Sequence, residues 1–191
     1  ESSAASDVYK RQYKESFSVP EVSIGKTRIE QLQCALNRKR DEFGAYSKER
    51  LYRLFHGTLD VSLSANGNGG SYEDTMYLTK NTNHIRIILQ HLSGEDINVD
   101  RFTFRINDEN GLMAYNNDIL TDENINYRPW KTLNGEVGVG KNDTRAIITV
   151  KGAIVDLTVG RMMYEHRSKM ILTITNAVSY THLTLPTTPY V

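Results

Sequence analysis

The sequence predicts a mainly β protein, in which an antiparallel β-sandwich with one short helix is followed by the truncated start of a second β-sandwich. Three observations favour this fold class. Apolar and polar residues alternate with a period of two in several segments, as they do in half-buried strands. Clusters of Asn, Asp and Gly separate these segments, and runs of β-branched residues occupy the last third of the chain.

The composition is that of an ordinary globular chain. Of its 191 residues, 39% are hydrophobic and 24% are charged, which argues against a disordered protein. The 23 Lys and Arg residues balance the 23 Asp and Glu residues, so the basic excess of a nucleic-acid-binding protein is missing. No segment approaches the roughly 18 apolar residues of a transmembrane helix. A single cysteine leaves no internal disulfide and no Cys-rich zinc site.

The two ends differ in composition from the rest of the chain. Residues 178–191 carry no Asp, Glu, Lys or Arg but contain Pro186 and Pro189, and residues 3–12 show no hydrophobic period. Both segments resemble translated read-through of sequencing adapters, and the alternative is a frayed tail plus a proline-containing edge strand. We therefore predict that residues 1–12 and 178–191 are non-native and that a fragment of a longer protein, residues 13–177, lies between them.

The first third of the chain predicts one helix. Residues 13–21 are typical of an edge strand or a loop, and residues 24–43 fit a helix and a strand equally well. Residues 48–55 follow a possible cap, Ser47, and precede Gly57, which suits a helix stop. Because Leu and Phe residues share one helical face there, we expect a short helix of about two turns.

The middle of the chain predicts strands. Leu59, Val61 and Leu63 alternate with polar residues up to a turn signal at 66–70, and residues 76–78 indicate a weaker strand. Two further segments present one apolar face each and suggest an antiparallel sheet packed on a second layer. Their predicted core residues are Ile85, Ile87 and Leu89 in one segment and Phe102, Phe104 and Ile106 in the other.

The last third predicts a domain boundary. Gly135, Gly138 and Gly140 stand among few apolar residues, so residues 135–145 are the best linker candidate and residues 13–134 form the first domain. Three β-rich runs within residues 146–177 are too short to bury a core of their own. We interpret them as the first strands of a second β domain.

The sequence contains no recognisable catalytic or cofactor-binding motif. The histidines form no H-E-x-x-H pair, the glycines match neither G-x-G-x-x-G nor a P-loop, and Cys34 is typical of a small core residue. Asp108, Asn110 and Gly111 indicate a tight turn, although a loose cation site among Asp108, Asn110 and Asp118 is an alternative. We therefore expect no enzyme, no cofactor and no catalytic or metal site.

A basic triplet at residues 38–40 is the main candidate for a charged binding surface. Aromatic residues are sparse around it, and Asp41, Glu42 and Glu49 neutralise its field. A solvated face is the better interpretation, so no nucleic-acid partner is expected.

An ordered series of segments resembles the FimB-type fimbrial anchor family, the minor-fimbrium anchor subunits of Bacteroides-like bacteria. The resemblance covers roughly residues 50–176. Its members are Leu54–Gly57, Asn83–Gln90, Phe102–Gly111, Tyr115–Asn117, Tyr127–Pro129, Val155–Met163 and Met170–Ile174.

The resemblance implies a lipoprotein with two transthyretin-like β-sandwich domains that holds the base of a fimbrium at the outer membrane. Its partners would be other fimbrial subunits, joined by strand exchange along an unpaired sheet edge. The lipid-anchor cysteine of the family is absent, and Cys34 is no substitute because the residues before it are polar. The anchor is expected to precede Tyr13.

The sequence pattern also suggests roles for several single residues. Tyr127 and Trp130 are expected to cover a domain junction. Asp156 and Arg161 should pair if both are buried, because an isolated buried charge is costly, or else both face solvent. Asp74, Thr75 and Met76 resemble a short acceptor motif for protein O-glycosylation in these bacteria.

Two other functions remain open from the sequence. A secreted β-sandwich could bind carbohydrate or mediate adhesion through Trp130 and some of the eleven tyrosines. A hydrolase could assemble its carboxylates only in the folded chain.

Overall fold

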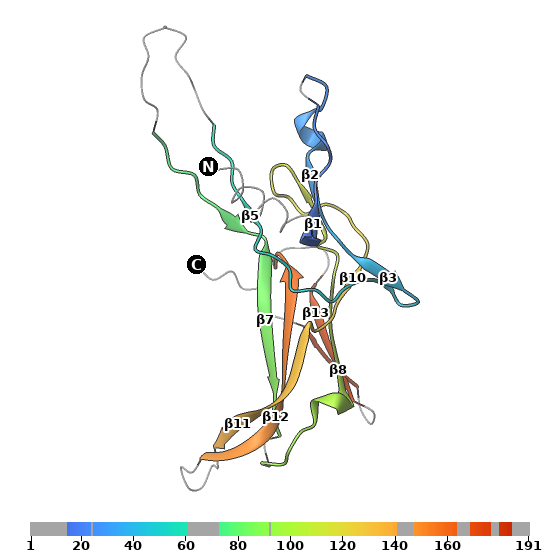
Figure 1. Cartoon of the computed structure of the whole chain (residues 1–191), viewed down its shortest axis with the longest axis vertical. Coiled ribbons are helices and arrows are strands. Elements are labelled where there is room, and N and C mark those ends of the chain that lie inside the picture. The colour runs from blue at the N-terminus through green and yellow to red at the C-terminus, as the bar shows by residue number, and fades with distance from the viewer. Residues whose placement is uncertain are drawn as a thin grey trace, which may run out of the picture.

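A computed structural model describes residues 15–23, 25–60, 73–91, 93–140, 147–163, 169–176 and 180–184. The chain is mainly β, as predicted. Two sheets face each other, and two arms extend from one end of this sandwich (Figure 1). No described helix has the length and apolar character needed to cross a lipid bilayer.

The first main sheet has three antiparallel strands in the order β11-β12-β7. The central strand is paired along its whole length, because β11 covers one edge and β7 covers the other over residues 153–160. The strands are β7 (Thr82–Leu89), β11 (Lys131–Gly140) and β12 (Ile147–Gly160).

The second main sheet has six strands in the order β14-β13-β8-β10-β4-β3. All neighbours are antiparallel except β10 and β4, which run parallel. The strands are β3 (Lys39–Asp41), β4 (Gly44–Ser47), β8 (Phe102–Asp108), β10 (Ile125–Tyr127), β13 (Ile171–Asn176) and β14 (Tyr180–Thr184).

Two small sheets and two single-turn 3-10 helices complete the described structure. One sheet joins three strands in the order β1-β2-β9, and the other is the two-stranded arm β5-β6. The elements are β1 (Phe17–Ser18), β2 (Gln33–Leu36), β5 (Phe55–His56), β6 (Thr79–Lys80), β9 (Leu112–Ala114), η1 (Ile29–Gln31) and η2 (Val99–Arg101).

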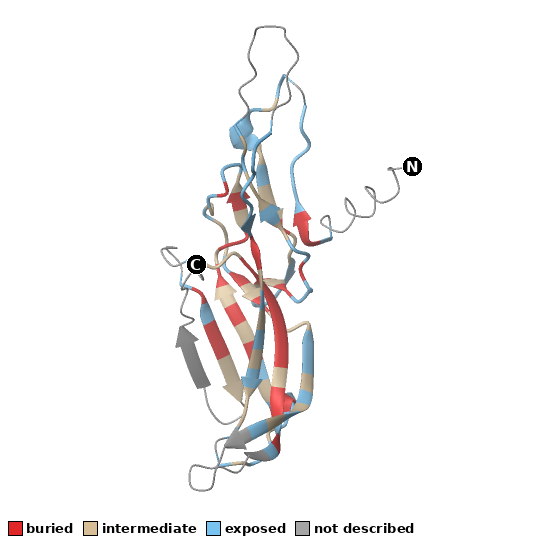
Figure 2. Cartoon of the chain, turned by 90° about the vertical axis from the view of Figure 1, so that its left-hand side faces the viewer, coloured by how far each residue is buried: buried red, intermediate tan, exposed pale blue. Residues whose placement is uncertain are grey.

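The hydrophobic core lies between the two main sheets (Figure 2). The predicted alternation in β7 and β8 is confirmed: Ile85, Ile87 and Phe102 pack against the core, and Phe104 and Ile106 belong to it. β12 supplies Ala153, Val155, Leu157 and Val159, all of them completely buried.

The predicted helix over residues 48–55 is wrong. Ser47 closes β4 instead of capping a helix, and its carbonyl accepts a hydrogen bond from the backbone N–H of Arg128. Leu51 is buried, but Phe55 is 48% exposed and lies in β5. A two-turn helix depends on burying one apolar face, and this segment does not bury one, so an extended backbone prevails.

The expected linker over residues 135–145 is also corrected, because its first part is strand. β11 continues through Gly140, and Gly135 lies directly opposite Gly152 of β12. A Cβ atom added at Gly135 would collide with the side chain of Ile154. The glycine therefore permits close packing within a sheet and does not mark a flexible connection.

The expected second domain, residues 146–177, shares its sheets with the first. β12 pairs with β7, and β13 pairs with β8, so both bring late residues into sheets that contain early ones. The pattern of the β-branched runs reflects sequence neighbours alone, whereas β7 and β8, which join these runs to the early part of the chain, are 60 or more residues away from them. Within the described residues, the expected boundary at 135–145 does not separate two cores.

Some expectations fall outside the described residues. They concern Ile24, the alternation of Val61 and Leu63, and the turn signal at 66–70. Residues 180–184, within the segment predicted to be non-native, form β14 at the edge of the six-stranded sheet. This pairing does not bear on whether the segment is native.

Tyr127 lies inside the sandwich and not at a domain junction. It is completely buried, and its hydroxyl donates a 2.6 Å hydrogen bond to Oδ1 of Asn110. Desolvation raises the pKa of Tyr127, so the phenol stays neutral and keeps its proton for this bond. The Asn110 side chain also donates to the carbonyl of Arg161 and ties the β8–β9 connection to the end of β12.

Asp156 follows neither of the two alternatives, pairing with Arg161 or facing solvent, because it is buried and pairs with Arg86. The carboxylate is 1% exposed and accepts hydrogen bonds of 2.8 and 3.0 Å from Nε and Nη2 of Arg86, which lies opposite it on β7. His84 Nε2 lies 3.3 Å from the same carboxylate. The hydrogen bond from Arg86 lowers the pKa of Asp156 against the opposing effect of burial, and the charge of Arg86 adds to the lowering.

Truncation of Leu157 tests the position of the core. We expect Leu157→Ala to lower the free energy of unfolding by about 2–5 kcal/mol, because it leaves a cavity among completely buried side chains. Ile88→Ala is the control: Ile88 is 51% exposed on the adjacent strand, and we expect a loss of less than about 1 kcal/mol. Urea unfolding measures the free energy of unfolding of both variants. Equal decreases for Leu157→Ala and Ile88→Ala would contradict the assignment of the inner face.

Acid titration tests the ion pair between Asp156 and Arg86. The pKa of Asp156 in the folded state lies below its ordinary value of 3.8, so its stabilising contribution is complete above that value. The contribution is lost as the pH falls through the lowered pKa. We expect the difference in unfolding free energy between the unsubstituted chain and Asp156→Asn to shrink from about pH 5 downward. A difference that stays constant between about pH 6 and about pH 2 would rule out this linkage.

Candidate functional site

The six-stranded sheet is incomplete along one edge of β8. β13 pairs with β8 from Phe102 to Asn107, whereas β10 pairs with it only from Ile106 to Asp108. Residues 102–105 therefore have a strand on one side only within the described parts of the chain. An unpaired strand edge presents backbone N–H and C=O groups that another strand can bind.

The path of the chain after β10 creates this open edge. Pro129 has no backbone N–H to donate to a sheet, and the preceding residue is Arg128. The next backbone N–H, that of Trp130, donates a 3.0 Å hydrogen bond to the carbonyl of Asp156 in the opposite sheet. The chain therefore crosses from the β8 sheet to the β12 sheet at this point, and no strand of the described residues lies on this side of residues 102–105.

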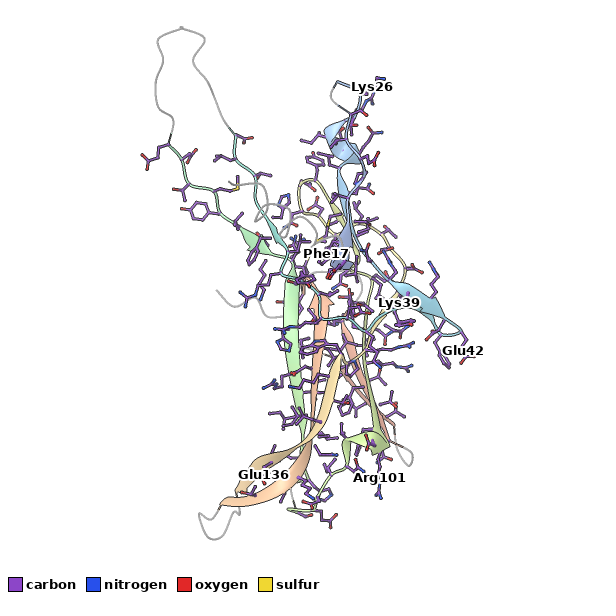
Figure 3. All side chains as sticks on the ribbon, viewed as in Figure 1. Phe17, Lys26, Lys39, Glu42, Arg101 and Glu136 are labelled. Atoms are coloured by element: carbon purple, nitrogen blue, oxygen red, sulfur yellow. The ribbon has the colours of Figure 1, made fainter. Side chains whose placement is uncertain are left out.

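A groove of about 570 Å³ lies along the open edge. β8 and β11 contribute to its walls, and the β3–β4 hairpin contributes its exposed tip, which projects from the body beside Glu42 (Figure 3). The lining is mainly apolar with charged groups at the rim. Its principal side chains are Phe43, Phe102, Phe104, Arg105, Pro129 and Thr132.

An ion pair holds one side of the groove. Arg128 Nη1 lies 2.7 Å from the carboxylate of Asp41, and its guanidinium stacks 4.2 Å from the centre of the Tyr46 ring. The hydrogen bond from Arg128 lowers the pKa of Asp41, so this carboxylate stays ionised in mildly acidic solution. The pair fixes the hairpin tip, including the 71% exposed Phe43, next to the groove.

The groove combines two features that suit an extended peptide. Backbone groups along residues 102–105 can form main-chain hydrogen bonds, and the adjoining apolar surface can receive alternate side chains. No reactive side chain is needed for such a site. The sequence pattern predicts the apolar face of β8 but not its open edge. The local signal for that edge is Pro129.

Trp130 is a poor platform for the alternative, carbohydrate-binding function. Its Nε1 donates a 3.1 Å hydrogen bond to Thr158, and the Arg50 guanidinium lies 5.2 Å from the ring centre. The His84 ring packs against it at 5.6 Å. The indole is half-buried, and these internal partners occupy its surroundings.

The described residues contain no group of three His, Cys, Asp or Glu side chains that could hold a metal ion. The suggested cation site among Asp108, Asn110 and Asp118 is not assembled, because Asn110 binds Tyr127 and Asp118 binds the side chain of Asn116. Burial raises the pKa of the Cys34 thiol to about 11, which makes this residue a poor nucleophile.

Two surface clusters are also explained by internal pairing. Glu15 and Glu49 share a cavity, but Glu49 is exposed and forms a 2.8 Å ion pair with Lys39. Arg38 and Arg40 of the basic triplet pair with Asp122 and Glu123, respectively. Neither cluster forms an acid–base pair of the kind a hydrolase would use.

The predicted glycosylation motif lies on the surface of the β5–β6 arm. Asp74, Thr75 and Met76 are exposed, and the Asp74 carboxylate accepts a 2.7 Å hydrogen bond from the backbone of Thr75. The threonine hydroxyl is accessible, and modification of Thr75 stays a prediction.

The fold is similar to that of several solved bacterial proteins. A candidate adhesin from Bacteroides thetaiotaomicron VPI-5482 is 26% identical, with a TM-score of 0.66 over 90% of this chain and 54% of that protein. A candidate adhesin from Bacteroides ovatus is 18% identical, with a TM-score of 0.65 over 89% and 51%. The fimbrial anchor protein Mfa2 from Porphyromonas gingivalis is 14% identical, with a TM-score of 0.58 over 90% and 56%.

The chain thus spans about half the length of these structures. No curated protein sequence matches it significantly. The family described as fimbrillin-A associated anchor proteins Mfa1 and Mfa2 matches residues 7–190, nearly the whole chain. This agrees with the family resemblance carried by the ordered segments between residues 50 and 176. The chain belongs to the family of fimbrillin-A associated anchor proteins.

Proposed function

We propose that this protein is a structural subunit of a cell-surface fimbrium, acting as an anchor or assembly subunit. Its partners are other fimbrial subunits, and the association occurs by addition of a β-strand from a partner to the open edge of β8. The single observation that carries this proposal is the groove of about 570 Å³ beside residues 102–105, which pair with β13 on one side and with no described strand on the other. Family membership supplies the fimbrial context.

The incoming strand would continue the line of β10 beyond Tyr127, beside residues 102–105 of β8. It would lie between β8 and the start of β11, with backbone hydrogen bonds to residues 102–105. Alternate side chains would enter the groove against Phe102 and Phe104, and Phe43 would cover them from the hairpin tip. The sheet would then be continuous, and a solvent-exposed edge would be buried.

We further propose that the full-length protein is tethered to the outer membrane by a lipid anchor that precedes Tyr13. Cys34 is unsuited to carry the lipid: it lies in β2 opposite Met113 of β9, and its side chain packs against the core. A complete reading frame that encodes no cysteine at the end of a signal peptide would contradict the tether without affecting the groove.

The origin of the two ends also remains a proposal. We infer from composition that residues 1–12 and 178–191 derive from sequencing adapters. The family match covers half of the first segment, residues 7–12, and nearly all of the second, residues 178–190, so it does not set them apart from the rest of the chain. Resequencing the source gene across codons 12 and 178 decides the matter, since an uninterrupted native reading frame would refute the adapter origin.

Hydrogen–deuterium exchange tests the strand-accepting groove. Among residues 102–105, we expect the amides that point away from β13 to exchange rapidly in the isolated chain. They should exchange at least about tenfold more slowly once the chain binds the fimbrial subunit encoded in the same gene cluster. The physical reason is that a paired strand protects edge amides that water otherwise reaches. Protection confined to other surfaces would contradict the proposal.

A pair of exposed apolar residues provides matched variants for the same assay. Phe43→Ser removes the proposed cover of the bound strand and should weaken association about tenfold. Val22→Ser changes a residue of similar exposure, 64% compared with 71%, that does not line the groove, and it should leave association unchanged. Equal effects of the two substitutions would remove the groove from the interface.

A further inference from the structure

Arg161 differs in its partners from the part-buried Arg38 and Arg128. Arg38, Arg86 and Arg128 each form an ion pair with a carboxylate. Arg161 forms none with any described residue, although its side chain is part-buried. The hydrogen-bond partners of its Nη2 are the carbonyl of Asn117 and the sulfur of Met163, both neutral.

The guanidinium also retains unused donors. Its Nε is buried and has no hydrogen-bond partner in the described structure. A guanidinium carries five N–H groups, and among the described residues only those of Nη2 have hydrogen-bond partners. Desolvation lowers the pKa of Arg161, against a smaller opposing effect of the Asp118 charge, but leaves the side chain fully charged at neutral pH. A part-buried charge without a directly bonded counter-ion is costly and calls for an anionic partner.

Arg161 lines a cavity of about 480 Å³ at the arm-bearing end of the sandwich. The walls come from three places: the β5–β6 arm, the connection that follows β9, and the segment after β12. This cavity shares no lining residue with the groove beside β8. It is therefore a separate candidate site.

A left-handed turn in the connection after β9 positions the guanidinium. Asn117 has a φ of 73°, in the left-handed region that non-glycine residues seldom adopt. Its side chain accepts a 2.6 Å hydrogen bond from the buried Asn81, and its carbonyl accepts from Arg161.

The rest of the cavity wall is suited to a sugar. The hydroxyls of Thr58, Thr75 and Thr79 can exchange hydrogen bonds with sugar hydroxyls. Tyr77 also lines the cavity and is 85% exposed, so its ring is available to pack against the apolar face of a pyranose. The carboxylate of Asp118 is engaged by Asn116 at 2.7 Å and forms no ion pair with Arg161.

We propose that this cavity binds a carboxylated sugar, such as a uronic acid residue of an acidic polysaccharide. The sugar carboxylate would pair with the free N–H groups of Arg161, and the ring would lie against Tyr77. A guanidinium recognises a planar carboxylate through two parallel hydrogen bonds, which no neutral sugar can form. The protein would then contact acidic polysaccharide as well as fimbrial subunits.

Titration calorimetry with the full chain tests this site, with trigalacturonic acid as the probe and its methyl ester as the matched neutral ligand. We expect the acid to bind and the ester to bind at least about tenfold more weakly, because only the acid offers a carboxylate. Arg161→Gln should weaken the binding of trigalacturonic acid by a similar factor, and Arg161→Lys should weaken it by less. Tyr77→Ala should weaken the binding of trigalacturonic acid but not that of sodium acetate.

Arg101→Gln is the matched control, because Arg101 lies at the opposite end of the molecule from the arms (Figure 3) and should not affect binding. Circular dichroism must show that each variant is folded, and Tyr77→Ala keeps the test valid if Arg161→Gln unfolds the chain. Equal affinity for acid and ester, or no loss on both Arg161→Lys and Tyr77→Ala, would overturn the proposal. Acetate binding as tight as trigalacturonate binding would reduce the site to a simple anion site and equally refute it.

Discussion

The burial of β12 on both faces is the constraint on which the rest of the structure depends. This strand is 14 residues long, and every residue from Val155 to Gly160 is buried. One face supplies the apolar centre of the core, whereas the other carries Asp156 and Thr158. A buried carboxylate is tolerated only when its charge is compensated, and Arg86 and His84 on the neighbouring strand provide that compensation.

The same strand determines where the opposite sheet opens. The carbonyl of Asp156 accepts a hydrogen bond from the backbone N–H of Trp130. Because of this hydrogen bond, the chain leaves β8 after Tyr127. Pro129 favours this change of direction, because it has no backbone N–H that would be left without a hydrogen bond. The open edge of residues 102–105 thus follows from how β11 joins β12. The groove is built by the packing of the sandwich and does not depend on a flexible loop.

The two candidate sites use different physics and lie on different parts of the molecule. The groove beside β8 offers backbone groups and apolar surface, which suit a protein strand of many sequences. The cavity around Arg161 offers a fixed charge and polar side chains, which suit a small acidic group. A subunit with both would be able to join a fimbrium and to contact acidic polysaccharide at the same time.

Local sequence pattern was sufficient for the fold class and for the inner faces of β7 and β8. A period of two and strong turn residues depend on neighbours along the chain, which the sequence displays directly. The same local signals failed at residues 48–55, where the apolar residues share a helical face but bury no such face in the fold. They failed again at Gly135, where a residue typical of linkers accommodates Ile154 across a strand pair.

The partners of charged residues and the edges of sheets were decided only by the tertiary structure. Asp156 and Arg161 are five positions apart, yet one binds Arg86 from a distant strand and the other binds a neutral carbonyl. Antiparallel pairing joins residues that are dozens of positions apart, and no local pattern specifies that register. The sequence by itself therefore determined that this is a β-sandwich of the fimbrial anchor type. Long-range pairing determined where its edge is open and which of its charges are left without a directly bonded counter-ion.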